Sequence, residues 1–264
     1  MCAFRKVTKK VEVAADESLS DFLLSEENSS DKIRQFLSSV GIVSATKYPQ
    51  STGIPPPAKA PEPTPKRVAF LVDYSGSMAS TDGSSTRRID AAIDCVVDFF
   101  DKYIDDGFDS VQFSLFNGAL SSPIVPMSIK SAAQRQKINN QRSPDGGTSL
   151  YTAISGILDA FTAVSYSPVN DWVIALTDGD TADHNQRDTC LRKVRSSKVN
   201  LFLIAFGRDA REKDKPVFKT LEQIRDTSLA GGNNSHCEVA EDKAKLAAVF
   251  DQIVQLMDSP ILSS

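Results

Sequence analysis

Three short segments of the chain combine oxygen-bearing side chains with glycine. They read Asp73-Tyr-Ser-Gly-Ser, Gly146-Gly-Thr and Thr177-Asp-Gly. The side chains in them that could bind a cation are two carboxylates and three hydroxyls: Asp73, Ser75, Ser77, Thr148 and Asp178. The set contains no sulfur and no imidazole, so its hard oxygen atoms suit Mg²⁺, Mn²⁺ or Ca²⁺ rather than zinc.

Each segment taken alone also fits ordinary turn chemistry, because Asp, Ser and Gly all favour turns. The three together, in this order and each beside an expected strand or helix, predict a cation site. Hydroxyl ligands cancel little of the ion's charge, so the ion would seek an anionic ligand from outside. An Asp or Glu side chain of a partner protein would suit.

The expected elements place the three segments at one edge of a sheet. Apolar runs predict strands at 68–72, 110–117, 172–177, 200–207 and 235–240, with a short edge strand within 120–128. Helical periodicity covers 87–104, 131–140, 150–163, 186–196, 216–228 and 242–257. This alternation predicts an α/β fold: a doubly wound, mainly parallel six-stranded sheet with helices on both faces. Ligand sites in such sheets form at the carboxyl ends of the strands.

The first 66 residues differ in character from the rest. Residues 1–48 form an N-terminal, partly helical segment in which Ile33, Phe36, Leu37 and Val40 share one helical face. This face either packs on the following domain or docks a partner. Residues 49–66 contain seven prolines and are expected to form an extended linker, with docking on an SH3-like module as the alternative. The domain that carries the site spans 67–260.

Composition excludes several classes of protein. The chain has 264 residues, a net charge of −4 and a pI near 5.3, which argues against a protein-wide basic surface for nucleic acid. It contains no apolar run of 18 residues and no secretory signal. Its four scattered cysteines are therefore expected to be reduced thiols in a cytoplasmic protein. Acylation of Cys2 at a membrane is the alternative.

The three segments together resemble the metal-ion-dependent adhesion site of von Willebrand factor A domains, and the resemblance covers about Lys66–Pro260. It implies that Ser75, Ser77 and Thr148 bind the ion directly, whereas Asp73 and Asp178 act mostly through water. The family often has a smaller or aliphatic residue in place of Tyr74. The resemblance further implies metal-dependent binding of a partner protein, and a last helix, 242–257, that shifts with ligand state. We expect a monomer.

Other functions are weighed against this interpretation. The chain could be a non-catalytic subunit of a larger intracellular assembly, of the ATPase or chelatase type. A metal-dependent hydrolase is the less favoured alternative, because no nucleophile elbow or phosphate-binding loop is present, and we expect no enzyme. His184 follows the third segment and could line the site or simply lie exposed on a loop. Asp180 and Asp183 could hold a second cation or, as is favoured, cap a helix near Asn185.

Overall fold

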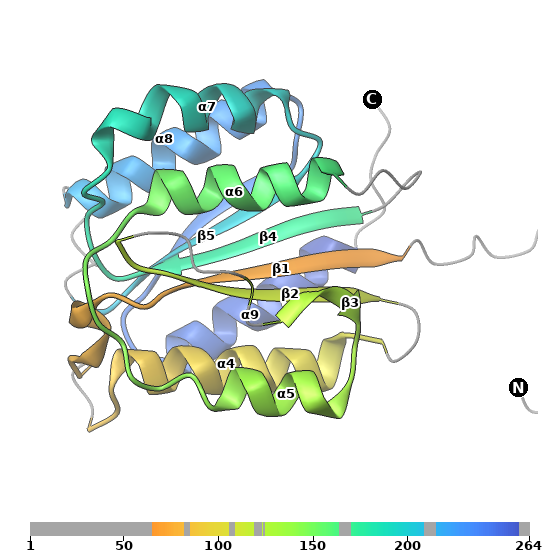
Figure 1. The fold of residues 1–264 in the computed structure, drawn as a ribbon, viewed down its shortest axis with the longest axis vertical. Helices are drawn as coiled ribbons and strands as arrows, with labels where there is room; N and C mark the ends of the chain where they lie inside the picture. The colour runs from red at the N-terminus through yellow and green to blue at the C-terminus, as the bar shows by residue number, and fades with distance from the viewer. Residues whose placement is uncertain are drawn as a thin grey trace, which may run out of the picture. The chain divides into compact units, whose positions relative to one another are not determined.

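The computed structural model describes residues 65–81, 85–105, 109–118, 123, 125–163, 170–208 and 215–258. The expected N-terminal helical segment and residues 49–64 of the linker lie outside these ranges. The described residues form one sheet covered by helices on both faces (Figure 1).

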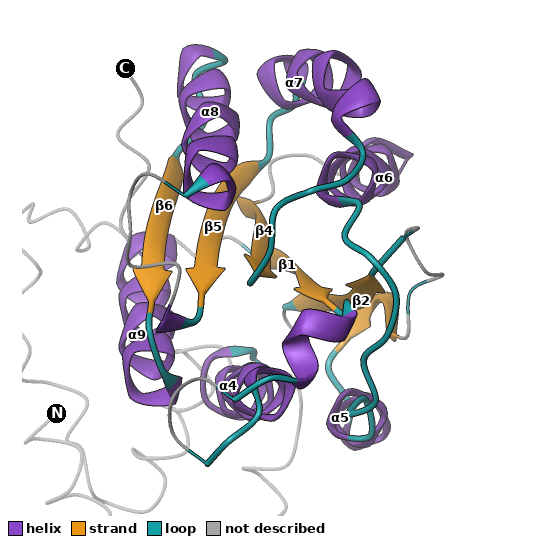
Figure 2. Cartoon of the chain, turned by 90° about the vertical axis from the view of Figure 1, so that its left-hand side faces the viewer, coloured by secondary structure: helices purple, strands orange, loops and turns teal. Residues whose placement is uncertain are grey.

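The sheet has six strands in the order β3-β2-β1-β4-β5-β6. Their bounds are β1 Lys66–Asp73, β2 Ser110–Phe116, β3 Val125–Ile129, β4 Asn170–Thr177, β5 Asn200–Phe206 and β6 Ser235–Ala240. Every neighbouring pair is parallel except β2 and β3, which run antiparallel. β1 and β4 lie side by side at the centre, so the residues that follow them emerge at the same edge (Figure 2).

Helices cover the two faces in equal number among the described residues. Helices α4 (Arg88–Tyr103), α5 (Ala132–Asn139) and α9 (Lys243–Asp258) lie on one face, below the sheet in Figure 1. Helices α6 (Leu150–Ala163), α7 (Arg187–Ser196) and α8 (Pro216–Ala230) lie on the other. Two short 3-10 turns, η2 (Gly76–Ala79) and η3 (His184–Gln186), follow β1 and β4.

The apolar core has two layers because the strands alternate side chains between the faces. Phe70 of β1 points toward α4 and α9, where its ring contacts those of Phe99 and Phe250 at centroid distances of 5.5 and 6.4 Å. Leu71, the next residue, belongs to the layer beneath α6, α7 and α8. Strands buried on both faces explain why the sequence of β1 is almost continuously apolar.

A series of hydrogen bonds between buried side chains connects the last turn of α9 to the amino ends of the central strands. Asn170 donates from Nδ2 to the carbonyl of Met257 at 2.9 Å. The same side chain accepts through Oδ1 from Trp172 Nε1 at 2.7 Å and from Asn200 Nδ2 at 3.4 Å. The buried side chains of Asn170, Trp172 and Asn200 thereby have hydrogen-bond partners, which avoids the cost of burying them unsatisfied.

The predicted fold class is confirmed in sheet size, mainly parallel direction and helices on both faces. The expected edge strand is β3, which accommodates Pro126 because an edge strand can lack a ladder hydrogen bond. Cys95 and Cys190 are buried and Cys237 is half-buried, all three as free thiols. Among the described helices, none is both long and apolar enough to cross a membrane.

Candidate metal site

The three oxygen-bearing segments converge at the carboxyl ends of β1 and β4. Asp73 is the last residue of β1, and Asp178 directly follows β4. Thr148 lies just ahead of α6, which begins at Leu150. A backbone hydrogen bond of 3.0 Å from Gly76 N to the carbonyl of Gly146 joins the first segment to the second.

Hydrogen bonds connect three of the candidate ligands in series. The hydroxyl oxygens of Ser75 and Ser77 are 2.9 Å apart, and Ser77 Oγ donates to Asp178 Oδ1 at 2.6 Å. The other carboxylate oxygen of Asp178 accepts from Arg88 Nη1 at 2.8 Å. The carboxylate of Asp178 is thus held from both sides, and its side chain is fully shielded from solvent.

Asp73 lies deepest in the site and is fully buried. Its Oδ1 accepts from the backbone N–H of Ser75 at 2.8 Å, and its Oδ2 accepts from Thr177 Oγ1 at 2.6 Å. Burial raises the pKa of Asp73 to about 6; the bonds from Thr177 and Ser75 lower it, and the charge of Asp178 raises it further. A bound cation would favour the ionised form of this carboxyl group.

The hydroxyl groups of Thr148 and Ser77 both lie close to Gly179. A Cβ atom added to Gly179 would lie 3.6 Å from Thr148 Oγ1 and 3.7 Å from Ser77 Oγ, so both hydroxyls lie against this glycine. Gly179 thereby allows the loop after β4 to pass close to hydroxyls from the other two segments. The structure therefore brings all five predicted ligand residues into one neighbourhood.

Tyr74 fixes the loop that carries Thr148. Its hydroxyl accepts from the backbone N–H of Ser143, and its carbonyl accepts from that of Asp145, both at 2.9 Å. Tyr74, which the resemblance marks as unusual, therefore supports this loop through its side chain at Ser143 and through its backbone at Asp145. It touches the loop backbone and none of the five candidate ligands in the contacts described.

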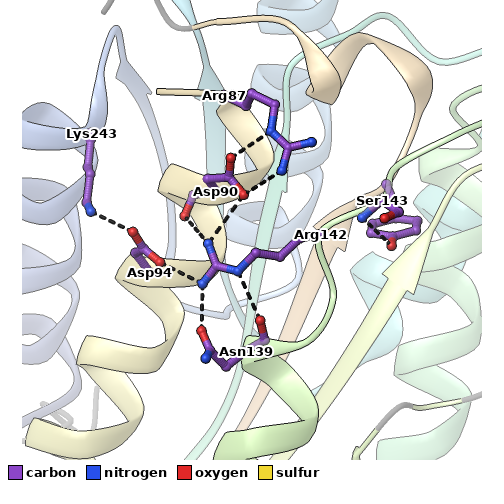
Figure 3. A network of polar contacts seen from close by, with 8 residues as sticks. Arg87, Asp90, Asp94, Asn139, Arg142, Ser143 and Lys243 are labelled. Carbon is purple, nitrogen blue, oxygen red and sulfur yellow. Dashed lines mark hydrogen bonds and ion pairs between the residues drawn. The ribbon is translucent and has the colours of Figure 1, made fainter. Parts of the chain in front are cut away.

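A charged network holds the start of the same loop against α4 (Figure 3). Arg142 donates from Nη2 to Asp94 Oδ1 at 2.7 Å and from Nη1 to Asp90 Oδ1 at 3.3 Å. Its Nη2 also donates to Asn139 Oδ1 at 2.6 Å, at the end of α5. Lys243, the first residue of α9, donates to Asp94 Oδ2 at 2.7 Å. The network thus joins α4, the loop and α9.

Asp183 caps a different helix from the one expected. Its carboxylate accepts from the backbone N–H groups of Thr152 at 2.7 Å and Tyr151 at 3.4 Å, and from the hydroxyls of Thr152 and Thr181. These donors belong to α6 and to its own loop, not to the helix near Asn185, so that prediction is wrong. Burial raises the pKa of Asp183, but the bonds from Thr181 and Thr152 outweigh it and hold the pKa below the usual value.

The other two residues weighed beside the third segment lie on its outer side. Asp180 is exposed, and its Oδ1 accepts from the adjacent backbone N–H of Thr181, so it does not cap the helix near Asn185 either. His184 is exposed on η3, with its ring centroid 6.5 Å from that of Tyr151. This placement matches an exposed loop histidine.

Sequence reasoning missed two residues that contact the candidate ligands, Thr177 and Arg88. Thr177 ends β4 with its hydroxyl turned to Asp73, and only the register of β1 against β4 brings them together. Arg88 carried one signal: a cation in the first turn of a helix opposes the helix dipole, which suggests a nearby anion.

The donor set fits a hard divalent cation. Two carboxylates and three hydroxyls gather at one edge of the sheet, and all of them are oxygen donors of the kind that Mg²⁺ and Ca²⁺ prefer. Among the described residues, no cluster of three or more His, Cys, Asp or Glu side chains able to hold a metal occurs. The candidate site therefore depends on its serine and threonine hydroxyls.

Comparisons with known proteins agree on the fold. A family model described as the von Willebrand factor type A domain matches residues 68–252. Among solved structures, the PilB minor pilin from Streptococcus sanguinis is 14% identical with a TM-score of 0.62, and the match covers 78% of this chain and 64% of the pilin. This chain thus spans less than two thirds of the pilin's length. A comparison with curated proteins found no match.

Two further structures are similar at this level. The von Willebrand factor type A protein from Catenulispora acidiphila is 18% identical with a TM-score of 0.58, covering 74% of this chain and 43% of the other. The SpRpn10 VWA domain is 12% identical with a TM-score of 0.58, covering 76% of this chain and 100% of that domain. Identities this low establish a shared fold and nothing more.

Proposed function

Because this chain belongs to the von Willebrand factor type A domain family, we propose that it is a protein-interaction module that binds its partner through a divalent cation. Domains of this family are typically adhesion or interaction modules. The cation would be held by Asp73, Ser75, Ser77, Thr148 and Asp178. The partner would contribute an Asp or Glu carboxylate.

The observation that carries this proposal is the convergence of the five oxygen-bearing side chains at one edge of the sheet. Ser75, Ser77 and Asp178 already lie within hydrogen-bond distance in series, and Thr148 Oγ1 lies with Ser77 Oγ over Gly179. Asp73 is oriented from below by Thr177 and by the Ser75 backbone. The hydroxyls of Ser75, Ser77 and Thr148 would bind the cation, and the two carboxylates would balance its charge.

When bound, Mg²⁺ or a similar cation supplies a positively charged centre that accepts an additional oxygen ligand. The chain's own residues would select the ligand by charge and by access. Ser77 is exposed, whereas Asp73 and the side chain of Asp178 are buried. Of the five candidate ligands, Ser77 is therefore the one that faces solvent, and both carboxylates lie beneath it.

The same contacts favour binding over catalysis. A general base must reach the proton that it removes, and its pKa must suit the transfer. Both carboxylates are instead engaged on both oxygens, Asp73 by Ser75 and Thr177, and Asp178 by Ser77 and Arg88. We therefore assign no hydrolytic activity to the site. Metal-dependent turnover of phosphate or peptide esters would contradict this assignment.

The test combines a direct cation measurement with partner capture. Titration calorimetry with Mg²⁺ is expected to give one site in the wild type and a strongly weakened site in Thr148→Ala. Immobilised protein is then incubated with native extract in Mg²⁺ or in EDTA, for the wild type and for Thr148→Ala. A partner held through the cation is retained only by the wild type in Mg²⁺.

The matched control is Thr162→Ala. It also removes a threonine hydroxyl, but one at the far end of α6 that donates to the Leu158 carbonyl. This variant is expected to bind both Mg²⁺ and the partner as the wild type does. A partner retained equally in EDTA and by Thr148→Ala would move the binding surface away from this site. Absence of Mg²⁺ binding by the wild type would refute the proposal.

A further inference from the structure

Arg88 stands out because it lies where a cation is unfavourable on three counts. It is the first residue of α4, where its charge opposes the positive end of the helix dipole. Its side chain is only 11% exposed, so the guanidinium loses most of its water. It also lies beside a group of oxygens that are suited to a second cation.

Three residues, Ser80, Asp178 and Gly207, fix the position of Arg88. Its backbone N–H donates to the carbonyl of Ser80 at 2.8 Å, and its Nη1 donates to Asp178 Oδ2 at 2.8 Å. Gly207, which follows β5 with a φ of 117°, lies beneath the guanidinium. A Cβ atom on Gly207 would come within 2.8 Å of Arg88 Cζ. The residues that follow β4 and β5 thus both pack against the Arg88 side chain.

The ion pair between Arg88 and Asp178 changes the net charge of the candidate site. With both carboxylates ionised, Asp73, Asp178 and Arg88 sum to a formal charge of −1, so a divalent cation would leave the site at +1. Without the guanidinium, the two carboxylates would neutralise the cation completely. A site at +1 attracts a carboxylate, whereas a neutral site does so weakly. The same guanidinium repels the cation, so it weakens cation binding.

We propose that Arg88 is a specificity-determining residue that lowers the site's affinity for its cation and raises its affinity for a carboxylate ligand. This inference rests on the proposed cation-binding function and adds the selection of an anionic partner. Arg88 would act through Asp178, by cancelling the charge of that carboxylate while its Oδ1 stays bonded to Ser77.

The test uses Mn²⁺ as the cation and acetate as the carboxylate, with the full chain at pH 7.5 and constant ionic strength. Electron paramagnetic resonance of free Mn²⁺ gives the cation Kd. Water-proton relaxation of the Mn²⁺ complex then reports whether acetate displaces bound water.

The variants are Arg88→Gln, which keeps hydrogen-bond donors for Asp178 but loses the charge, and Arg88→Lys, which keeps the charge. The control is Arg135→Gln, which removes one charge from an exposed ion pair with Asp101 at the far end of α4.

Arg88→Gln is expected to bind Mn²⁺ about tenfold more tightly and acetate about tenfold more weakly than the wild type. Arg88→Lys and Arg135→Gln are expected to resemble the wild type in both measurements. The inference is overturned if Arg88→Gln binds Mn²⁺ equally or more weakly, or if its acetate affinity is unchanged. These results leave the proposed function intact as long as the wild type binds Mn²⁺ and Thr148→Ala does not. A wild type that binds no Mn²⁺ refutes both.

Discussion

Asp183 lies on the loop that follows β4, and yet its carboxylate accepts the backbone N–H of Thr152 in the first turn of α6, 2.7 Å away. The third oxygen-bearing segment and the helix that follows the second are thereby joined by a side chain that is not a candidate ligand. This contact fastens the loop that carries Asp178 to the first turn of the helix that follows Thr148.

Replacing Asp183 with Ala is expected to lower the free energy of unfolding by about 1–3 kcal/mol, because it removes the cap of α6 and leaves N–H donors unsatisfied. Chemical denaturation of the cation-free protein measures this change. Asp180→Ala is the control, since Asp180 is exposed and bonded to the adjacent Thr181 N–H. Its effect should stay within about 0.5 kcal/mol. Equal effects of the two changes would show that the cap contributes little.

The buried carboxyl group of Asp73 should make the cation-free protein less stable as the pH rises. Its pKa is about 6 in the folded state against 3.8 in the unfolded chain, so the folded state binds the proton more tightly. The free energy of unfolding should therefore fall as the pH rises from about 3 to about 7, by about 3 kcal/mol in total, of which about 2 kcal/mol falls between pH 4 and pH 6. Asp73→Asn should remove this decrease.

Thermal unfolding of both proteins in EDTA, from pH 4.5 to 7.5, measures the difference. Other groups titrate in this range, and the comparison with Asp73→Asn cancels their contributions. The variant should be the more stable protein at pH 7.5, with a margin that shrinks toward pH 4.5. A margin that is constant across the range would mean that Asp73 is not the group responsible.

The two glycines ahead of Thr148 should respond differently to substitution. Gly146 has a φ of 80°, and a Cβ atom there would lie 3.3 Å from Asn117 Nδ2, whereas a Cβ on Gly147 meets nothing within 4 Å. Gly146→Ala should therefore cost about 1–2 kcal/mol of stability and weaken Mg²⁺ binding, because alanine resists a positive φ. Gly147→Ala should change stability by less than about 0.5 kcal/mol. Similar losses in both variants would argue against this loop conformation.

Removing the hydroxyl of Tyr74 should loosen the loop without unfolding the sheet. Tyr74→Phe leaves the Ser143 N–H without its 2.9 Å acceptor, at an expected cost of about 1 kcal/mol. Hydrogen exchange of the Ser143 and Asp145 amides should quicken, and Mg²⁺ affinity should fall by a small factor. The amides of β5 serve as the internal reference. Unchanged exchange at Ser143 would show that the Tyr74 hydroxyl does not hold the loop.

The sequence predicts the sheet and the neighbourhood of the site because both follow from local patterns. β1 and β4 are buried on both faces and therefore read as continuous apolar runs, and the strand-end rule then places Asp73 and Asp178 at one edge. Helix starts and ends agree with the periodicity to within a few residues. Alternating strands and helices leave few other topologies open.

The supporting contacts could not be predicted because they depend on register and on loop paths. The bond from Thr177 to Asp73 requires β1 to lie beside β4 at one specific offset. Asp183 lies beside η3 in sequence, so a cap for the following helix was the natural interpretation, but the loop folds back onto α6. The pairing of Arg88 with Asp178 spans 90 positions in the chain.

At the opposite end of the sheet, the hydrogen bonds around Asn170 make Trp172 an optical probe of the last helix. Trp172 is the single tryptophan of the sequence, it is 1% exposed, and its indole N–H is bonded to the Asn170 side chain that also holds the Met257 carbonyl. Detachment of the final turn of α9 would change the polarity and hydrogen bonding around this one fluorophore. The emission maximum of the unlabelled protein, recorded while cation and partner are titrated, therefore reports whether that helix stays docked.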